Sequence, residues 1–566
     1  MSPLDPFLSS THIAYFSMEI ALRPEMHTYS GGLGVLSGDT VRSSADLELP
    51  MVFVTLACRA GYFLQEITPA GDQVESPDWW RPERWCTALD AMVAVRIGGR
   101  PVWVRPWLYV HTSSTGHKIP VILLDTDHDA NQAEDRGITN TLYGGGNEYR
   151  LRQEAVLGIG GVRILRALEF QVRTFHLNEG HAALLTLELL HERRAAEKAL
   201  GANDPAHVYA EIRNSCAFTT HTPVEAGHDR FSYETVHGEL GDFTDYDELR
   251  RLAGHDRLNM TQLALNLCGY VNGVALRHAE TSEKMFPGYR VRAVTNGVHV
   301  ETWAHAAFAK LYSETIPHWQ HEPIVLMRIL HVPDEAVWNA HQTAKRDLFT
   351  EIRARTGVEL DPAVPTLGFA RRMTGYKRPT LLFSDLERLQ AIAGKTPFQV
   401  VLAGKAHPHD TDGKNKIRWI HDTIRRLDKN IRCVFLPGYD MEIAKSIVSG
   451  CDVWLNTPQP PLEASGTSGM KAALNGALNL STLDGWWVEA CIEGVTGWAI
   501  GGDGGDVSDA THAGALYDKL EHVVLPLYYN QPDKWRWMMK QAIAVVPSYF
   551  NSQRMMRRYA SEAYLR

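Results

Sequence analysis

The strongest constraint on the fold is a pattern in the second half of the chain, where short apolar runs alternate with segments of helical periodicity. The apolar runs are TLGFA, FQVVLAG, IRCVFLPG, CDVWLN and ALNLSTLD, and helical patterns such as KIRWIHDTIRRLD lie between them. Strands that alternate with helices form parallel sheets covered on both faces. We therefore predict an α/β fold. Because open parallel sheets bind ligands at the carboxyl ends of their strands, chemistry should be sought just after these runs.

The first half of the chain mixes strand-like and helical segments. MVFVTLACR, which begins at Met51, predicts a buried strand, whereas the residues after Gly34 and after His181 have the apolar spacing of helices. The segment MTQLALNLCGYVNGVALRHAETSEKMF predicts one long helix that ends at a Pro-Gly turn. A domain boundary near Val300 would divide the chain into residues 1–300 and 301–566. Two such domains facing each other would place a site in the cleft between them.

Composition argues against several classes of protein. The 566 residues suffice for two large domains or three smaller ones. Lys and Arg number 57 against 66 Asp and Glu, and this net charge of −9 argues against a general nucleic-acid-binding protein. The 7 scattered cysteines form no CxxC pair, as expected of reduced thiols in a cytoplasmic protein. The first residues predict no signal peptide, and no apolar stretch approaches the ~18 residues of a membrane span.

The most informative segment is EASGTSGMK, which runs from Glu463 to Lys471. Small residues let backbone amides approach an anion, and a helix beginning near Gly469 would direct its positive end at that anion. Met470 and Leu474 would partly desolvate the lysine, which lowers the pKa of its amino group and favours reaction with an aldehyde. The alternative is a glycine loop that caps a structural helix and carries a surface lysine.

A second segment concentrates positive charge. Arg371, Arg372, Lys377 and Arg378 fall within RRMTGYKR, directly after the strand-like TLGFA. A run of charges often forms a solvated face, but this one follows a buried strand at the edge where ligands bind. An anion site and a solvated face are therefore both open at this point.

Other positions have simple interpretations when each is taken alone. The glycines of GGLG, which begins at Gly31, could hold a phosphate, but such a loop is weak support for that role. His221 is best interpreted as a core histidine, Asn296 as a turn residue and Asn178 as a helix cap. The spacing of the histidines around Glu179 does not match HExxH, so no metal site is predicted. The tryptophan pairs could stack on sugars, but core packing is favoured for most of them.

The combination of segments carries more information than any one of them. SGGLG, LNEGH, TTHTPVEAG, TNGV, ARRMTGYKR, GKAHP and EASGTSGMKAALNGALNLSTLDG occur in this order. Between about Tyr15 and Trp487 the chain resembles the glycogen and maltodextrin phosphorylases, most closely their shorter bacterial and archaeal branch.

The resemblance implies a fold and a reaction. The fold would be of the GT-B type, with Rossmann-like domains at 1–300 and 301–566, a site in the cleft between them, and C-terminal helices that cross back. The reaction would be retaining phosphorolysis of an α-1,4-glucan or maltodextrin. Inorganic phosphate would release glucose 1-phosphate, and pyridoxal 5′-phosphate would be the cofactor.

The resemblance also implies roles for individual residues. Lys471 looks like the lysine that carries the coenzyme, and Arg372 and Lys377 look like the pair that holds the attacking phosphate. The main-chain carbonyl of His221 would face the positive charge that develops at the anomeric carbon. Further coenzyme contacts would be Thr467, Ser468, Arg371, Tyr439 and Tyr376. Glucan or phosphate contacts would be Gly31, Gly32, Leu33, Asn178, Glu179, Asn296, Glu463, Ala464, Ser465 and Gly466.

Some features depart from the family pattern. Gly469 stands where asparagine is frequent, Asp440 where a basic residue is usual, and Arg371 where lysine is usual. The glycine loop comes about thirty residues from the start, so we expect no N-terminal phosphorylation switch, and homo-oligomerisation is left open. Two alternatives remain: a retaining glycosyltransferase of the same fold that uses a nucleotide sugar, and a non-catalytic glucan-binding relative.

Overall fold

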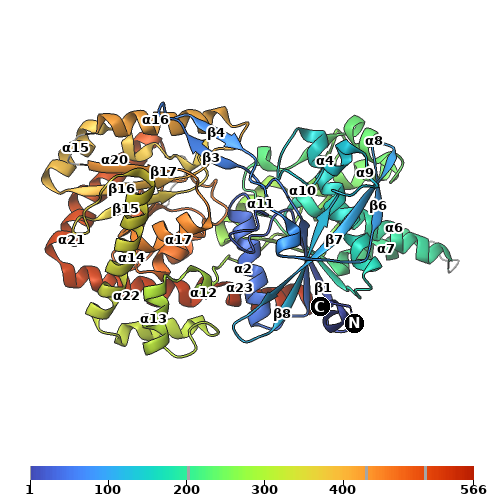
Figure 1. Ribbon diagram of the computed structural model, residues 1–566, viewed down its shortest axis with the longest axis horizontal. Helices are drawn as coiled ribbons and strands as arrows, with labels where there is room; N and C mark the ends of the chain where they lie inside the picture. Colours follow the sequence, from blue (N-terminus) through green and yellow to red (C-terminus); the bar gives the residue numbers. More distant parts are fainter. Residues whose placement is uncertain (1, 200–203, 428–430, 503–506, 566) are drawn as a thin grey trace.

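The computed structural model describes residues 2–199, 204–427, 431–502 and 507–565, and the chain folds into two lobes (Figure 1). The first lobe contains a 10-stranded sheet in the order β14-β13-β10-β9-β1-β2-β8-β7-β5, with β6 paired to β7. The strands from β14 to β8 pair in parallel, and β7 pairs antiparallel with β8, β5 and β6. Its strands are β1 (Ile13–Ser17), β2 (Met51–Leu56), β5 (Thr87–Ala88), β6 (Val93–Ile97), β7 (Arg100–Thr112), β8 (Lys118–Asp125), β9 (Thr174–Asn178), β10 (Cys216–Thr219), β13 (Tyr270–Gly273) and β14 (Arg292–Ala293).

The second lobe contains a 6-stranded parallel sheet in the order β17-β16-β15-β18-β19-β20. Its strands are β15 (Thr366–Ala370), β16 (Phe398–Ala403), β17 (Ile431–Leu436), β18 (Val453–Asn456), β19 (Leu478–Thr482) and β20 (Gly497–Ile500). The chain order reverses between β15 and β18. Loops that leave the sheet at such a reversal diverge and open a crevice, which is where ligands bind in open α/β sheets.

Burial explains why these segments are strands. Every residue of β15, β16, β18 and β19 is buried, as expected when helices cover both faces of a parallel sheet. The second lobe's helices include α14 (Asp334–Thr356), α15 (Leu386–Lys395), α16 (Thr411–Arg426), α17 (Met441–Gly450), α20 (Asp509–Lys519), α21 (Leu525–Asn530) and α22 (Pro532–Tyr549). The α/β class predicted from the sequence is confirmed.

One predicted element is wrong. The single helix expected from the MTQLALNL segment onward is α10 (Met260–Leu267), then β13, then α11 (Leu276–Met285). Gly269 ends the first helix: its N–H donates to the carbonyls of Arg213 and Cys216 rather than continuing a helical pattern. All of β13 is buried, and apolar periodicity alone does not distinguish a short buried strand from helix.

The last helix of the chain returns to the first lobe. α23 (Ser552–Tyr559) packs on α2 (Gly32–Asp46), where the hydroxyls of Ser43 and Ser552 lie 2.5 Å apart. The first sheet ends at β14 and the second begins at β15, with α12 (Val300–Trp303) and α13 (Ala306–Thr315) between them. The boundary near Val300 stays a prediction.

A hairpin of the first lobe reaches across to the second. It consists of β3 (Leu64–Ile67) and β4 (Gln73–Ser76), which Figure 1 shows beside α16. The side-chain amide of Gln65 bonds to Gly404 O (2.8 Å) and Gly438 N (2.9 Å). Gln73 bonds in the same way to both the N–H and the carbonyl of Ala406. Both glutamines are buried, so the hairpin fixes the two lobes relative to each other.

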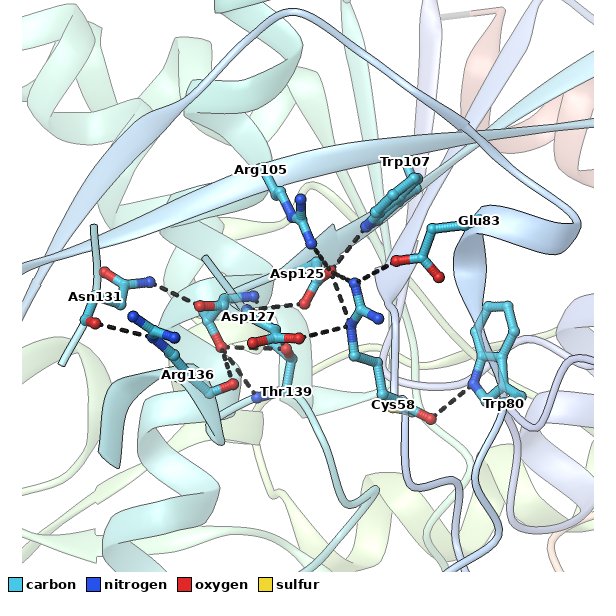
Figure 2. Close-up of polar contacts among 12 residues, drawn as sticks. Cys58, Trp80, Glu83, Arg105, Trp107, Asp125, Asp127, Asn131, Arg136 and Thr139 are labelled. Atoms are coloured by element: carbon cyan, nitrogen blue, oxygen red, sulfur yellow. Dashed lines mark hydrogen bonds and ion pairs between the residues drawn. The ribbon is translucent and has the colours of Figure 1, made fainter. Parts of the chain in front are cut away.

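A buried carboxylate ties two loops together at the carboxyl edge of the first sheet (Figure 2). Asp125, the last residue of β8, accepts hydrogen bonds from Trp107 Nε1 (2.8 Å) and from Arg59 Nη2 (2.8 Å), and Arg59 lies in the loop after β2. The loop after β2 also carries Tyr62, and the segment after β8 carries Tyr143. This network therefore fixes the loop after β2, to which the segment of Tyr143 is bonded through the N–H of Leu142 and the carbonyl of Gly61 (2.9 Å).

All 7 cysteines lie in the described residues, and they form no disulfide there. No helix of the described chain combines the length and the apolar character needed to cross a bilayer.

Replacing Gly404 by alanine should destabilise the second lobe. A Cβ at this position would lie 2.0 Å from the carbonyl oxygen of Arg371, and backbone atoms cannot rotate out of the way. We expect a loss of roughly 1–3 kcal/mol or more in the free energy of unfolding, measured by thermal denaturation. Gly394→Ala is the control, since a Cβ there meets nothing within 4 Å. Equal midpoints for Gly404→Ala and the wild type would contradict the expectation.

Candidate active site

The loops after β15 and β18 meet in a buried cluster of three charges. Glu463 Oε2 lies 2.5 Å from Arg371 Nη2 and 2.5 Å from Lys377 Nζ, and all three side chains are buried. Burial alone would raise the pKa of Glu463, but the two cations lower it to about 2. The carboxylate therefore stays ionised and bridges two cations at the reversal point of the sheet.

The cluster keeps unused hydrogen-bonding capacity. Arg371 Nη1 is buried and has no partner among the described residues, and the same is true of Ser465 Oγ. The backbone N–H of Glu463 donates to Asp484 Oδ2 (2.8 Å), which fixes the loop that carries the carboxylate. Burial raises the pKa of Asp484 to about 7, and the charge of Glu463 acts in the same direction.

Lys471 lies on α18 (Ser468–Leu474) and is buried. Its Nζ lies 3.7 Å from the centroid of the Trp303 ring, and within the described chain it makes no hydrogen bond or ion pair. Burial lowers the pKa of Lys471 to about 8, although Asp39 on α2 opposes this shift. Trp303 Nε1 donates to Asp39 Oδ2 (2.9 Å) and so connects the lysine to the first lobe. An amine in this setting is partly deprotonated, and nucleophilic, near neutral pH.

The residues before Lys471 form the start of α18. Ser468 Oγ accepts a hydrogen bond from Trp454 Nε1 (3.1 Å), and the side chain of Thr467 makes no cap bond. Gly466 has φ 84°, a left-handed conformation that favours glycine. Ala464 is half-buried between Glu463 and this turn.

The glycine loop of the first lobe is held by an acidic residue that follows β1. Glu19 Oε2 accepts hydrogen bonds from the N–H groups of Ser30 (2.6 Å) and Gly31 (3.1 Å), and Tyr143 Oη donates to Oε1 (3.0 Å). The Gly31 amide is thus bonded within the protein. Gly32, the first residue of α2, is exposed, and Leu33 beside it is half-buried.

Arg372 extends from the second lobe to the glycine loop of the first lobe. Its Nη2 lies 3.3 Å from the place that a Cβ on Gly31 would occupy, so a larger residue at 31 would crowd the guanidinium. Arg372 remains exposed, unlike Arg371 and Lys377. Tyr376 packs against Lys377 with 4.6 Å between the ring centroid and Nζ, and Tyr439 Oη lies 3.4 Å from the carbonyl oxygen of Ala370.

Three predicted residues meet at the carboxyl edge of the first sheet. Glu179 has a backbone φ of 74°, which is unusual for a residue other than glycine. Its Oε2 accepts a hydrogen bond from the backbone N–H of His221 (2.7 Å). His221 Nε2 lies 2.7 Å from Asn178 Oδ1. Since Asn178 Nδ2 donates to Ser17 and Ser37, its oxygen is the acceptor and His221 donates through Nε2. Burial lowers the pKa of His221 to about 4, which leaves a neutral ring with Nδ1 as an acceptor.

Asn296 supplies another unused acceptor. Its side chain is buried, and Oδ1 has no partner in the described part of the chain. The loop is fixed from both lobes: Thr295 Oγ1 donates to Glu489 Oε2 (2.8 Å), and Arg554 Nη2 donates to the carbonyls of Thr295 (2.8 Å) and Asn296 (3.2 Å). Buried polar atoms without a partner are uncommon and point to a missing ligand group.

Comparison with known proteins identifies the family of the chain. A family profile described as carbohydrate phosphorylase matches residues 224–497. The maltodextrin phosphorylase of Thermococcus litoralis is 35% identical over 98% of this chain and 70% of its own length. The glycogen phosphorylase of Mycobacterium tuberculosis is 37% identical over 98% and 71%, and that of Aquifex aeolicus 34% identical over 98% and 86%. The chain belongs to the carbohydrate phosphorylase family.

Two positions at which this phosphorylase departs from the family pattern have a structural reason. At Gly469 a Cβ would lie 2.3 Å from Asn479 Oδ1 and 2.7 Å from the Trp486 ring, so a larger residue there would require these two side chains to move. Asp440 caps α17: its carboxylate accepts from the N–H of Ile443 (2.8 Å).

Several residues of the candidate site are not among those predicted from the sequence. Glu19 lies two residues after β1 and belongs to none of the segments that carry the resemblance, whereas Asp484 lies two residues after β19 and inside one of them, but no sequence pattern indicated a role for it. Trp303, which lies against Lys471, had no signal in the sequence. Trp486 and Trp487 are buried, so the interpretation of that pair as core residues is confirmed.

Replacing Glu463 by glutamine should destabilise the phosphorylase by about 3–5 kcal/mol, because two buried cations would lose their shared carboxylate. Thermal unfolding checks this. Added inorganic phosphate should raise the midpoint of the variant more than that of the wild type, since the anion can take the place of the carboxylate. Asp509→Asn is the control: it also removes a carboxylate from an arginine, but the Asp509 side chain is 69% exposed. A Glu463→Gln variant as stable as the wild type would show that these ion pairs contribute little.

Proposed function

We propose that the protein cleaves α-1,4-linked glucans with inorganic phosphate, releases glucose 1-phosphate with retention of configuration, and uses pyridoxal 5′-phosphate held by Lys471. The main structural support is a buried, unpaired amine of lowered pKa at the point where the two lobes meet. The names of the relatives, maltodextrin and glycogen phosphorylases, support the substrate class. In this proposal residues 1–300 and 301–566 are the two domains, and cysteines that form no disulfide in the described residues suit a cytoplasmic enzyme.

The residues present fit the coenzyme. Its aldehyde requires a neutral amine, and Lys471 is the buried amine without a polar partner in the described chain. Its phosphate requires several donors. Arg371 Nη1 is unused, and the backbone amides at Thr467 and Ser468 begin a helix. Tyr439 and Tyr376 would lie on the same side of the coenzyme as these donors. When bound, the coenzyme supplies a phosphate group that exchanges a proton with the substrate phosphate.

The protein's cations determine where the substrate phosphate lies. Two anions held about 4 Å apart in a partly buried site repel by several kcal/mol per charge pair. Arg372, which reaches the glycine loop, and Lys377 would bind the attacking phosphate and offset that repulsion. As the phosphate binds, Lys377 would turn from Glu463 toward it, and Glu463 would be free to accept a hydrogen bond from a sugar hydroxyl.

The first lobe would hold the sugar. His221 Nδ1 and Asn296 Oδ1 are acceptors suited to glucose hydroxyls, while Asn178 and Glu179 fix the histidine. The main-chain carbonyl of His221 would face the oxocarbenium-like charge that develops at the anomeric carbon. Ala464, Ser465 and Gly466 would approach the sugar from the second lobe, and Gly31, Gly32 and Leu33 would lie on the phosphate side.

Replacing Lys471 by alanine should abolish both the bound-coenzyme absorbance and phosphate-dependent release of glucose 1-phosphate from maltodextrin. The reason is that no other amine of the site is buried without a polar partner in the described chain. Lys310→Ala, at a 76% exposed side chain, is the control and should retain both signals. Retained phosphorolysis in Lys471→Ala, or consumption of a nucleotide sugar by the wild type without need for phosphate, would contradict the proposal.

Coenzyme uptake should depend on pH through Lys471. Only the neutral amine attacks an aldehyde, and the pKa of Lys471 is lowered to about 8. The rate of uptake by coenzyme-free protein should therefore rise about tenfold per pH unit below that value and level off above it. The growth of absorbance after pyridoxal phosphate is added measures the rate. A midpoint near that of an ordinary lysine, about 10.4, would show that burial does not activate this amine.

A further inference from the structure

A cavity of about 360 Å³ lies on the second lobe, apart from the candidate active site. Trp338 and Gln342 of α14 line it, together with Tyr528 of α21 and Trp535 of α22. Pro362, also in its wall, precedes β15, whereas Arg371 follows that strand. The cavity and the active site therefore lie at opposite edges of the second sheet, and Figure 1 shows α21 at the outer end of the lobe.

The aromatic rings of the cavity meet at steep angles. The Trp338 and Tyr528 centroids lie 6.3 Å apart with 55° between the ring planes, and those of Tyr528 and Trp535 lie 5.0 Å apart at 84°. A flat base is held best between parallel aromatic faces, which these pairs do not offer. A sugar ring presents C–H groups on both faces and around its edge, so it can contact rings that form a corner.

The polar groups of the cavity point to a neutral ligand with hydroxyl groups. Gln342 Nε2 is buried and has no hydrogen-bond partner in the described chain, a costly state for an amide donor. Trp338 Nε1 and Tyr528 Oη also lack a hydrogen bond within the described residues. The one lining cation, Arg536, is paired with Glu335. Among the described residues that line it, the cavity thus offers donors to hydroxyl oxygens but no cluster of cations such as a phosphate needs.

We propose that this cavity is a second carbohydrate site that binds a short stretch of an α-glucan chain. Trp338 and Tyr528 pack on the sugar rings, and Gln342 Nε2 donates to a hydroxyl. The identity of the sugar rests on the proposed function, while the aromatic corner and the unpaired amide do not depend on it. A site at the opposite edge of the sheet from the active site would hold a polysaccharide on the enzyme while a chain end occupies the active site.

Two cavity variants and one matched control test the proposal. Gln342→Ala and Trp338→Ala should raise the KM for glycogen about fivefold, the effect of losing one stacking or hydrogen-bonding contact. They should also reduce retardation in native gels that contain glycogen. The KM and kcat for maltotetraose, which is too short to reach both sites, should stay within about twofold of wild type. Trp537→Ala, on the same helix α22 but outside the cavity lining and 38% exposed, should leave every value unchanged.

The results of the two cavity variants and of hydrogen exchange support or overturn the second carbohydrate site. Unchanged retardation and an unchanged glycogen KM in both cavity variants would overturn the proposal. If Trp338→Ala fails to fold, Gln342→Ala carries the test, because it removes the polar contact and leaves the aromatic rings in place. In the wild type, maltoheptaose should slow hydrogen exchange in α14 around 338–342, and protection there by adenosine or inorganic phosphate instead would overturn the sugar assignment.

The two proposals fail in distinguishable ways. If the wild type shows no phosphorolysis but the cavity variants still alter retardation by glycogen, the proposed function fails and the second site stands. If phosphorolysis depends on Lys471 but the cavity variants behave as wild type, the function stands and the second site fails.

Discussion

The arrangement of the active site depends on one carboxylate, that of Glu463, placed between Arg371 and Lys377. These cations come from the loop after β15 and the carboxylate from the loop after β18. The two loops diverge because the chain order reverses between these strands, and the ion pairs hold them together. Two buried cations without this partner would repel each other and be poorly solvated. The carboxylate therefore offsets one of the two positive charges before any ligand binds, and the cluster keeps a positive charge for an incoming anion.

Buried acids have the same role in the first lobe. Glu19 accepts the amides of the glycine loop, Glu179 accepts the backbone N–H of His221, and Asp125 fixes the loop after β2. In each case an acidic side chain at the carboxyl edge of the sheet accepts hydrogen bonds from N–H groups that a loop would otherwise leave unpaired. The residues that would contact substrate are thus fixed by acids that need not contact it themselves.

This division of roles explains how far the sequence could predict the site. Arg372, Lys377 and Lys471 lie in basic or glycine-rich runs that follow apolar strands, so their location at the carboxyl edge of the sheet could be predicted, whereas their roles followed only from the resemblance to the family. Glu19 and Asp484 follow strands too, but neither the single acid Glu19 nor the acid at the end of the glycine-rich segment has a pattern that indicates its role. Their importance comes from neighbours that are far away in the chain.

The predicted helix around β13 and the predicted contact of the Gly31 amide differ from the structure, and both differences have physical causes. The region around β13 has helical composition on both sides of four buried residues, and only pairing with β10 and β14 makes that stretch a strand. The Gly31 amide, expected to face phosphate or substrate, instead donates to Glu19. The glycines of this loop allow close approach of the backbone, but the sequence does not say which acceptor approaches.

The hairpin formed by β3 and β4 limits how the enzyme can move. Gln65 and Gln73 are bonded to main-chain atoms of the other lobe, so a hinge-like separation on that side would break buried hydrogen bonds, which water replaces only after it enters. Opening by rigid-body rotation is therefore costly. A polymer is more easily admitted end first, by threading between lobes that stay engaged, than by wide opening and closing around its side.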